Sequence, residues 1–287
     1  MKVTLITVCF NSAATLSTAI DSVLSQKGVD IEYIIVDGGS SDGTVEIIKE
    51  HAEKTLNSQL LTPNFTFRWL SESDQGMYDA INKGIKMATG DVVGILNADD
   101  VLVSDDTLAH IADKFESGGV GSGGVRSGGV ESGGVGERVD CVYADIRFVR
   151  EGETVAALRE AKTVRYCSAK RWRPWMFRFA AMVPHPSFYV RRECFERLGG
   201  YSLDYRICAD FELELRYLYL AKLRAAYLPE CVVVMRMGGM STSGWRSNLV
   251  INREDLRALR SHGIWSCLPL IYLKYLFKIW GFVFKRK

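Results

Sequence analysis

The sequence lacks the cysteine spacing of a disulfide scaffold or a zinc module. It has seven cysteines, an odd number, and no two form a C-x-x-C pair; they stand at positions 9, 141, 167, 194, 208, 231 and 267. Extracellular disulfide frameworks and structural zinc sites depend on paired, closely spaced cysteines. We therefore expect reduced thiols and a cytoplasmic protein.

The sequence also lacks a strong excess of one charge and a signal peptide. Its net charge is only +2 over 287 residues, so we expect no nucleic-acid partner. The apolar run at residues 3–10 is too short and wrongly flanked for a secretion signal, and it is typical of a first β-strand. With 47% hydrophobic and 24% charged residues, the composition is that of a globular protein with a buried core.

Strand and helix patterns alternate through the first hundred residues. Short apolar runs are separated by segments of helical periodicity, and the runs lie at 3–10, 31–36, 67–70 and 92–96. This alternation predicts an α/β fold with a central, mostly parallel sheet flanked by helices. Further along, residues 139–149 have a strand pattern, and 209–221 and 245–262 have helical patterns.

Carboxylates follow two of these strands. Asp37 comes directly after the run IEYIIV, and Asp99 and Asp100 come just after VVGIL. Ligands of an open parallel sheet bind beyond the carboxyl ends of its strands, so both acidic sites should border one crevice. Adjacent carboxylates there suit Mg²⁺ or Mn²⁺ that bridges phosphate oxygens. The alternative is structural: Asp99 would cap the next element, and Asp100 would face solvent. The turn DGGSSDG lacks the G-x-G-x-x-G pattern, which argues against a dinucleotide-binding dehydrogenase.

Several segments together resemble the motifs of family 2 glycosyltransferases. They are ITVCFNSAATLSTAIDSVLSQ, YIIVDGGSSDGT and SESDQGMYDAINKGIKMATGDVVGILNADD, followed by HPSFYVRRECFERLGGYSLDYRICADFELELR. The resemblance is to the bacterial branch that makes exopolysaccharide, O-antigen or colanic-acid-type units, and it covers residues 1–110 and 139–240. It implies a GT-A fold and metal-dependent, inverting transfer from a nucleoside-diphosphate sugar. The implied acceptor is a lipid-linked or other oligosaccharide in cell-surface polysaccharide synthesis.

The resemblance also implies roles for acidic residues on the donor side. Asp37 would contact the nucleoside base, Asp99 the ribose, and Asp100 a divalent cation, Mg²⁺ or Mn²⁺. Asn97 stands where the first aspartate of a D-x-D motif is usual. Asp74 would border the nucleotide, although it could equally fix the N-terminus of the helix expected at 76–89.

On the acceptor side, Asp210 matches the catalytic base of the family. Inversion at the anomeric carbon requires a carboxylate that takes the acceptor's hydroxyl proton. Without the surrounding motif, Asp210 would be interpreted as a helix cap. His185 is a candidate substrate-binding residue, with a phosphate donor, a metal ligand or a packed side chain as the alternatives.

Two segments fall outside these motifs. Residues 117–136 are four copies of a five-residue unit, SGGVG, SGGVR, SGGVE and SGGVG, which we interpret as a flexible surface insertion with a substrate lid as the alternative. We expect a catalytic domain over 1–240, with a donor half at 1–110 and an acceptor half at 139–240. A helical C-terminal extension over 241–287 should follow it.

The tail at 264–287 has the pattern of an amphipathic helix. On a helical wheel a narrow polar stripe faces leucine and aromatic side chains, and the stripe contains Lys274, Lys278, Gly281 and Lys285. Such a helix favours the membrane interface with its lysines toward anionic lipid, at the inner face of the plasma membrane. A spanning helix and a helix packed on the catalytic domain are the alternatives.

Two other functions compete with sugar transfer. A sugar-nucleotide nucleotidyltransferase would need a glycine-rich basic loop near the first strand, and CFNSAAT has neither property. A non-catalytic nucleotide-sugar-binding module would not need Asp100 or Asp210.

Overall fold

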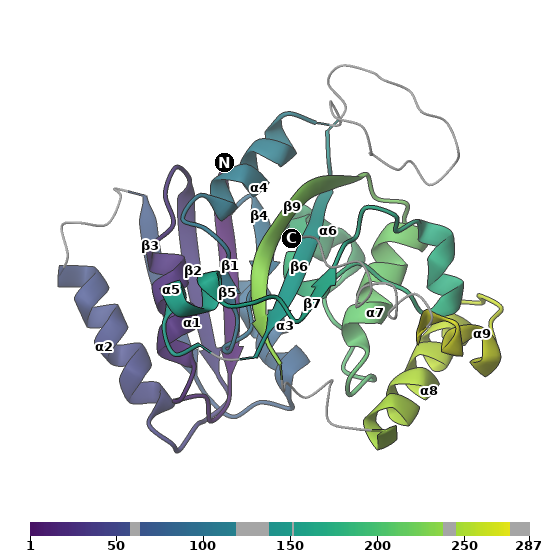
Figure 1. Cartoon of the computed structure of the whole chain (residues 1–287), viewed down its shortest axis with the longest axis horizontal. Coiled ribbons are helices and arrows are strands. Elements are labelled where there is room, and N and C mark those ends of the chain that lie inside the picture. The colour runs from purple at the N-terminus through teal and green to yellow at the C-terminus, as the bar shows by residue number, and fades with distance from the viewer. Residues whose placement is uncertain (58–63, 119–137, 151, 238–244, 276–287) are drawn as a thin grey trace.

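The computed structural model describes residues 1–57, 64–118, 138–150, 152–237 and 245–275 (Figure 1). The repeat expected to be a surface insertion falls almost wholly at 119–137, outside the described residues. So do the Gly-Gly-Met-Ser loop at 238–241 and the end of the tail at 276–287.

A nine-stranded mixed sheet forms the centre of the molecule. Its strands follow the order β3-β2-β1-β4-β8-β6-β9-β5, with β7 paired to β6. The N-terminal strands pair in parallel, as their apolar runs predict, and they are β1 (Lys2–Cys9), β2 (Asp30–Asp37), β3 (Phe65–Ser71) and β4 (Val92–Ile95). The carboxyl ends of these strands therefore lie at one edge of the sheet.

The second half of the sheet mixes directions. β8 pairs antiparallel with both β4 and β6, and β9 pairs parallel with β6 but antiparallel with β5. The bounds are β5 (Val101–Leu102), β6 (Cys141–Val149), β7 (Arg165–Cys167), β8 (Tyr189–Arg191) and β9 (Ala225–Arg236). The parallel prediction therefore holds for the donor half, and the acceptor half is added to it through β4 and β8.

Helices cover both faces of the sheet because successive strand residues point to opposite sides. In β1, Val3 and Leu5 join a core with α1 (Leu16–Leu24) and α4 (Thr107–Glu116). Ile6 and Val8 join the opposite core, which includes α3 (Met77–Met87). The remaining helices of the N-terminal and middle segments are α2 (Thr44–Asn57), α5 (Val155–Glu160), η1 (Pro174–Phe179), η2 (His185–Ser187) and α6 (Arg192–Leu198).

The expected acceptor half ends in a small helical layer. α7 (Ala209–Glu214) continues into the π-helical segment η3 (Leu215–Leu220), and α8 (Trp245–Ser261) packs against α7. α9 (Leu268–Tyr272) packs against both α8 and η1. Figure 1 shows α7, α8 and α9 together on the right, away from β1–β3.

The prediction that Lys274 faces lipid is wrong. Its Nζ lies 2.6 Å from Asp255 Oδ2 on α8, and only 5% of Lys274 is exposed. Ile271 is fully buried, so this part of the tail packs on the protein, as the third alternative for the tail had it. Over the described ranges, no helix combines the length and the apolar character that crossing a membrane requires.

Candidate functional site

Asp37 lies at the carboxyl end of β2 and is fully buried. Its Oδ2 accepts hydrogen bonds from Gly39 N and Ser40 N, both 3.1 Å, and from Ser71 Oγ at 2.7 Å. Burial alone would raise the pKa of Asp37, but the hydrogen bonds from Ser40 and Ser71 outweigh it and the pKa lies below its ordinary value. Asp37 is therefore an ionised carboxylate that fixes the loop after β2, and its contact with a base stays a prediction.

Asp74 lies against that same loop. A Cβ added to Gly38 would come within 2.5 Å of Asp74 Oδ2, so only glycine permits this close approach. Asp74 Oδ1 accepts a hydrogen bond of 2.8 Å from Gly76 N at the start of α3. The structure thus places Asp74 both at the N-terminus of α3 and beside Asp37, and these two of the expected donor residues come together.

Asp99 and Asp100 lie just beyond β4. Asp100 is fully buried; its Oδ2 accepts a hydrogen bond of 2.7 Å from Asn97 Nδ2, while Oδ1 is buried without a hydrogen-bond partner. Burial, and then the negative charge of Asp99, raise the pKa of Asp100 well above its ordinary value. Burial also raises the pKa of Asp99, against the positive charge of Arg236. A nearby positive charge therefore favours the ionised form of the buried Asp100 carboxyl.

Arg236, at the end of β9, was not found from the sequence. Its Nη1 donates to the carbonyl oxygen of Asp99 at 2.8 Å, and its Nη2 donates to that of Gly152 at 3.0 Å. The guanidinium therefore brings a fixed positive charge to the two aspartates. The preceding sequence VVVMR gives no signal for this, because the pairing depends on β9 returning past β5.

The residues near Asp100 fit one end of a divalent-cation site. Within the described parts of the chain, no group of three or more His, Cys, Asp and Glu side chains is placed to hold a metal ion. The unpaired Oδ1 of Asp100 supplies one hard oxygen ligand, and Asp99 stands beside it. Mg²⁺ commonly takes one or two protein carboxylates and completes its shell with substrate phosphates and water, so this partial set suits it.

Asp210 lies in the first turn of α7, facing α3. Its Oδ1 accepts hydrogen bonds from Phe211 N at 2.8 Å and from the hydroxyl of Tyr78 at 3.2 Å. Burial raises the pKa of Asp210 from 3.8 to about 6, while these two hydrogen bonds oppose the rise. A carboxylate with such a pKa can exchange a proton near neutral pH, as a general base must.

Two tyrosines connect Asp210 with His185. Tyr78 stacks on Tyr201 with ring centroids 5.6 Å apart, and Tyr201 shares a 2.7 Å hydrogen bond between its hydroxyl and His185 Nε2. Burial lowers the pKa of His185 to about 4, so its imidazole is neutral at pH 7. A neutral ring provides no positive charge for a phosphate, which favours the packed alternative; a substrate contact stays a prediction.

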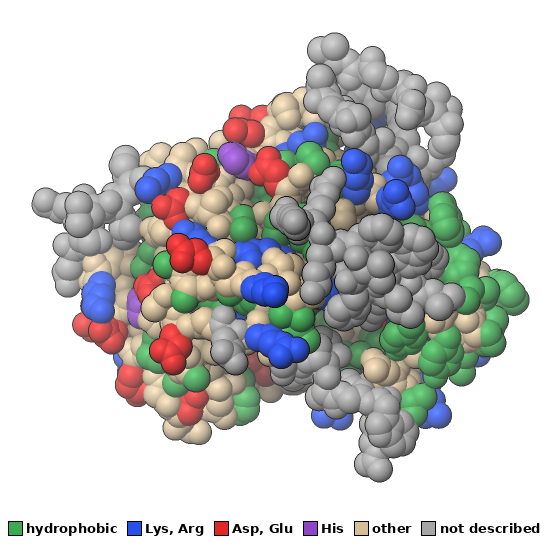
Figure 2. Space-filling view, viewed as in Figure 1, with side chains coloured by type: hydrophobic (Ala, Val, Ile, Leu, Met, Phe, Trp, Pro, Cys, Tyr) green, Lys and Arg blue, Asp and Glu red, His purple; other side chains and the backbone are tan. Residues whose placement is uncertain are grey.

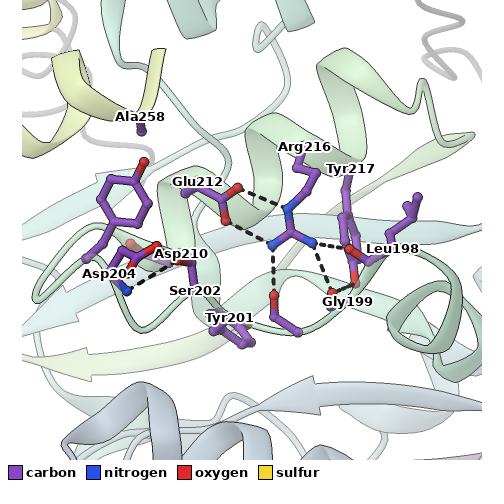
Figure 3. A network of polar contacts seen from close by, with 12 residues as sticks. Leu198, Gly199, Tyr201, Ser202, Asp204, Asp210, Glu212, Arg216, Tyr217 and Ala258 are labelled. Carbon is purple, nitrogen blue, oxygen red and sulfur yellow. Dashed lines mark hydrogen bonds and ion pairs between the residues drawn. The ribbon is translucent and has the colours of Figure 1, made fainter. Parts of the chain in front are cut away.

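An arginine network holds the turn that leads to Asp210. Arg216 lies between Glu212 of α7 and the carbonyl groups of residues 198–200, as Figure 3 shows. Its Nη2 donates to Glu212 Oε2 at 2.9 Å and to the Gly200 carbonyl at 2.7 Å. The Gly-Gly-Tyr turn is thereby fixed to the same helix that carries Asp210.

Glu254 of α8 holds residues 206–208, which directly precede α7. Its carboxylate accepts hydrogen bonds from three successive backbone N–H groups, those of Arg206 at 3.1 Å, Ile207 at 2.9 Å and Cys208 at 3.1 Å. The carbonyl oxygen of Ile207 in turn accepts a hydrogen bond from the hydroxyl of Tyr78. The sequence gives no signal for this role of Glu254, which stands 44 positions after Asp210, within the C-terminal extension expected over 241–287.

Glu214 is a further buried carboxyl that the sequence did not single out. It is fully buried one turn after Asp210; its Oε2 accepts a hydrogen bond of 3.1 Å from Val183 N, and its Oε1 has no hydrogen-bond partner. Burial, and then the charge of Asp210, raise the pKa of Glu214 well above its ordinary value. Glu214 therefore ties α7 to the segment before His185.

α3 links the donor and acceptor groups of residues. Asp74 stands just before its first turn, beside the loop of Asp37, and Tyr78 in its first turn reaches Asp210. Asp99 and Asp100 form the remaining pair, just beyond the end of β4, which β1 separates from β2 in the sheet.

Two solved structures share this architecture. The mannosyltransferase of Pyrobaculum calidifontis in complex with GDP-Man and Mn²⁺ superposes with a TM-score of 0.60 at 20% identity, over 98% of this chain and 72% of that one. Staphylococcus aureus TarS in complex with UDP-GlcNAc gives 0.57 at 17% identity, over 90% of this chain and 66% of that one. The fold is therefore the GT-A glycosyltransferase fold.

Sequence comparison defines the family. A family model described as glycosyl transferase family 2 matches residues 4–170, more than half of the chain. A PGL/p-HBAD biosynthesis glycosyltransferase of Mycobacterium bovis is 28% identical over 253 residues, 87% of this chain and 80% of the relative. An uncharacterized glycosyltransferase of Mycobacterium tuberculosis is 30% identical over 215 residues, 75% and 68% of the two chains. The chain belongs to glycosyl transferase family 2.

Proposed function

We propose that this glycosyltransferase transfers a sugar, with inversion, from a nucleoside diphosphate to a saccharide acceptor that is carried on a lipid in cell-surface polysaccharide synthesis. The observation that carries the proposal is Asp210, a half-buried carboxylate with a pKa of about 6 that faces Tyr78 of α3. Inversion needs one base on the acceptor side, and Asp210 has the location and the proton affinity for it.

The reaction assigns a role to each group of residues. Asp210 takes the proton of the acceptor hydroxyl as its oxygen attacks the anomeric carbon, and the bond from that carbon to the diphosphate oxygen breaks. Asp37, Asp74 and Asp99 orient the nucleotide, and Asp100 would hold a cation. A divalent cation there, Mg²⁺ or Mn²⁺, would neutralise charge on the departing diphosphate.

The comparisons support the donor class. One structural neighbour binds GDP-Man with Mn²⁺ and another binds UDP-GlcNAc, so a nucleoside-diphosphate sugar is the proposed donor for this chain as well. The mycobacterial relative is named as a glycosyltransferase of PGL/p-HBAD biosynthesis, which supports a biosynthetic sugar transfer. The corresponding place of action is the cytoplasmic face of the plasma membrane.

Asp210→Asn tests the base. It should keep donor affinity and reduce transfer by more than about tenfold, because the amide cannot accept the proton while the donor ground state is unchanged. Isothermal titration with UDP- and GDP-sugars measures the first quantity, and product formation by mass spectrometry measures the second. Asp204→Asn, an exposed carboxylate in the preceding turn, is the matched control. Transfer within about tenfold of wild type in Asp210→Asn would assign the base elsewhere.

Asp100→Ala separates the metal from the base. It should abolish the Mn²⁺-dependent part of nucleotide binding, which titration calorimetry detects without any turnover. A sugar-nucleotide nucleotidyltransferase would instead release pyrophosphate from a nucleoside triphosphate and a sugar phosphate. A binding module would bind donor and leave it intact in both variants and in wild type.

A further inference from the structure

The basic residues of this chain are concentrated in two segments that lack acidic residues. Residues 161–192 contain eight Lys and Arg, residues 256–287 contain seven, and neither contains Asp or Glu. The rest of the chain holds 21 Lys and Arg against 34 Asp and Glu. The small net charge therefore conceals a strong separation of charge along the chain.

The fold brings these two segments together. α9 packs against η1, and Ser266 Oγ donates a hydrogen bond of 2.7 Å to the carbonyl oxygen of Arg178. Basic side chains on and beside η1 are exposed, namely Lys170, Arg171 and Arg178. Figure 2 shows the charge separation in space: the acidic side chains visible on this face lie on its left half, whereas the right half carries hydrophobic and basic side chains.

Large apolar side chains are exposed on η1, on α9 and on the residues next to α9. We call the following set the Trp face: Trp175 (55% exposed), Trp265 (72%), Leu268 (36%), Tyr272 (43%) and Leu273 (38%). Trp175 is held by an edge contact with Phe179, at 5.8 Å between ring centroids. Two exposed tryptophans and a tyrosine with cationic neighbours have the composition that proteins place at the level of lipid headgroups.

We propose that the Trp face, with Lys170, Arg171 and Arg178, docks the protein on a membrane surface of anionic lipid. The tryptophan and tyrosine rings enter the headgroup layer, and the cations contact lipid phosphates. This inference names the membrane-binding surface of the proposed function and differs from the lysine stripe that the sequence suggests, because Lys274 of that stripe is buried against Asp255.

Charge decides between a membrane and a second copy of this chain. In a two-fold dimer through the Trp face, Lys170, Arg171 and Arg178 of one copy would face the same three residues of the other copy, and like charges repel. Anionic headgroups complement the same rim. The face therefore suits lipid better than self-association.

The position of the Trp face also serves the acceptor side of the site. η1 precedes His185 by a short segment in which Val183 N donates to Glu214 of α7, and α8 connects α9 to α7. A membrane docked at η1 and α9 would thus lie beside the half of the molecule that carries Asp210. A sugar acceptor on a lipid would be held near the base with little diffusion away from the surface.

Vesicle binding of the full chain tests the proposal. Co-sedimentation with phosphatidylcholine vesicles is compared with vesicles containing added phosphatidylglycerol, at low and high salt. We expect wild type to bind the anionic vesicles at least about tenfold more tightly, with the difference shrinking as salt rises. Bromine-labelled lipids should quench tryptophan fluorescence on binding.

Two double variants separate the apolar and the charged contribution. Trp175→Ser with Trp265→Ser should weaken binding to anionic vesicles by about tenfold or more, and Arg171→Glu with Arg178→Glu should do the same. Leu56→Ser and Leu203→Ser, exposed apolar residues on other elements, are the matched controls and should bind as wild type. Thermal unfolding and donor affinity check that each variant is folded.

The outcomes are distinct from those that test catalysis. Wild-type binding in both double variants, or equal binding to neutral and anionic vesicles, would overturn the proposal. So would a dimer in analytical ultracentrifugation that the Trp175 and Trp265 substitutions dissociate while vesicle binding stays absent. Vesicle binding requires no donor, and transfer to a water-soluble acceptor requires no vesicle, so failure of one proposal leaves the other measurable.

Discussion

At the scale of single residues, Asp210 depends on Tyr78 for its proton affinity. The hydroxyl of Tyr78 shares its one proton between Asp210 Oδ1 and the carbonyl oxygen of Ile207; this contact lowers the pKa of Asp210, burial raises it, and the balance is about 6. Since a base must be deprotonated, transfer should fall as pH decreases through about 6, while Tyr78→Phe should move this acidic limb to higher pH. The pH profile of kcat/KM measures the limb. Tyr201→Phe, whose hydroxyl contacts His185 instead, should leave it in place.

Glu254 allows geometry and charge to be separated at the same base. Glu254→Ala removes the acceptor of three backbone N–H groups just before α7, and a displaced base of this kind costs about a hundredfold in turnover. Glu254→Gln keeps a carbonyl acceptor and removes the charge that helps to raise the pKa of Asp210. It should therefore retain most of kcat and move the acidic limb to lower pH.

The acidic limb of the pH profile should move to higher pH in Tyr78→Phe and to lower pH in Glu254→Gln, while donor affinity stays unchanged. Both Glu254 variants should bind donor as wild type does, because Glu254 touches only the acceptor-side turn. If kcat and the pH profile were unchanged in Glu254→Ala, residues 206–208 would keep their conformation without the hydrogen bonds to Glu254. The groups that face Asp210 in these experiments are Tyr78 of α3, Tyr201, Cys208, Glu214 of α7, and Glu254 and Asp255 of α8.

The sequence predicts polar residues that end strands better than it predicts their partners. Asp37 and Asp100 follow apolar runs, so their place at the sheet edge follows from the strand pattern alone. Their burial, and the unpaired oxygen of Asp100, depend on loops that close over them. Arg236 and Glu254 could not be predicted, because each reaches its partner across a long sequence separation that no local period encodes.

At the scale of secondary structure, the tail shows the limit of a helical wheel. The wheel places Lys274 on a polar stripe, but α9 ends at Tyr272 and Lys274 meets Asp255, which stands 19 positions earlier. Long, periodic elements were predicted well: the strand pattern at 139–149 became β6, and the helical pattern at 245–262 became α8. Strands of two or three residues such as β5, β7 and β8 carry too few side chains to show a period.

The buried pair of Lys274 and Asp255 should control how the C-terminal helices hold together. Lys274→Met leaves a buried aspartate without its cation and should destabilise the protein by about 3–5 kcal/mol. Asp255→Asn combined with Lys274→Met removes both charges and should recover much of that loss. Urea unfolding measures both variants.

Equal destabilisation by the single and the double variant would mean that packing, and not the charge pair, fixes α9. The same pair predicts that truncation after Ser261 harms the catalytic domain, because it removes Lys274 together with the buried Ile271. Loss of membrane binding in a truncated chain would therefore be hard to interpret, which is why the point variants of the Trp face are the better test.

At the scale of the whole molecule, the repeat interrupts the chain between two well-defined elements. α4 ends at Glu116 and β6 begins at Cys141, and both join the core around β1. Replacement of 117–136 by a short Gly-Ser turn should leave the free energy of unfolding close to that of wild type and turnover within about twofold of it. The reason is that the entropy of loop closure changes slowly with loop length. Turnover and urea unfolding of the shortened chain measure both. A large loss of kcat at unchanged stability would favour the lid alternative.

α3 has one more consequence for the enzyme. Its N-terminus carries Asp74 beside the donor loop, and Tyr78, one turn later, touches both Asp210 and the carbonyl oxygen of Ile207. Asp74 and Tyr78 therefore lie within about one helical turn of each other, so a nucleotide that shifted the start of α3 would also shift the hydroxyl that contacts Asp210. Linkage then works in both directions: any factor by which the donor changes the proton affinity of Asp210 is the factor by which protonation of Asp210 changes donor affinity, and the unchanged donor affinity expected of Asp210→Asn corresponds to a factor close to one. Titration of donor affinity against pH, compared between wild type and Tyr78→Phe, measures this coupling along α3.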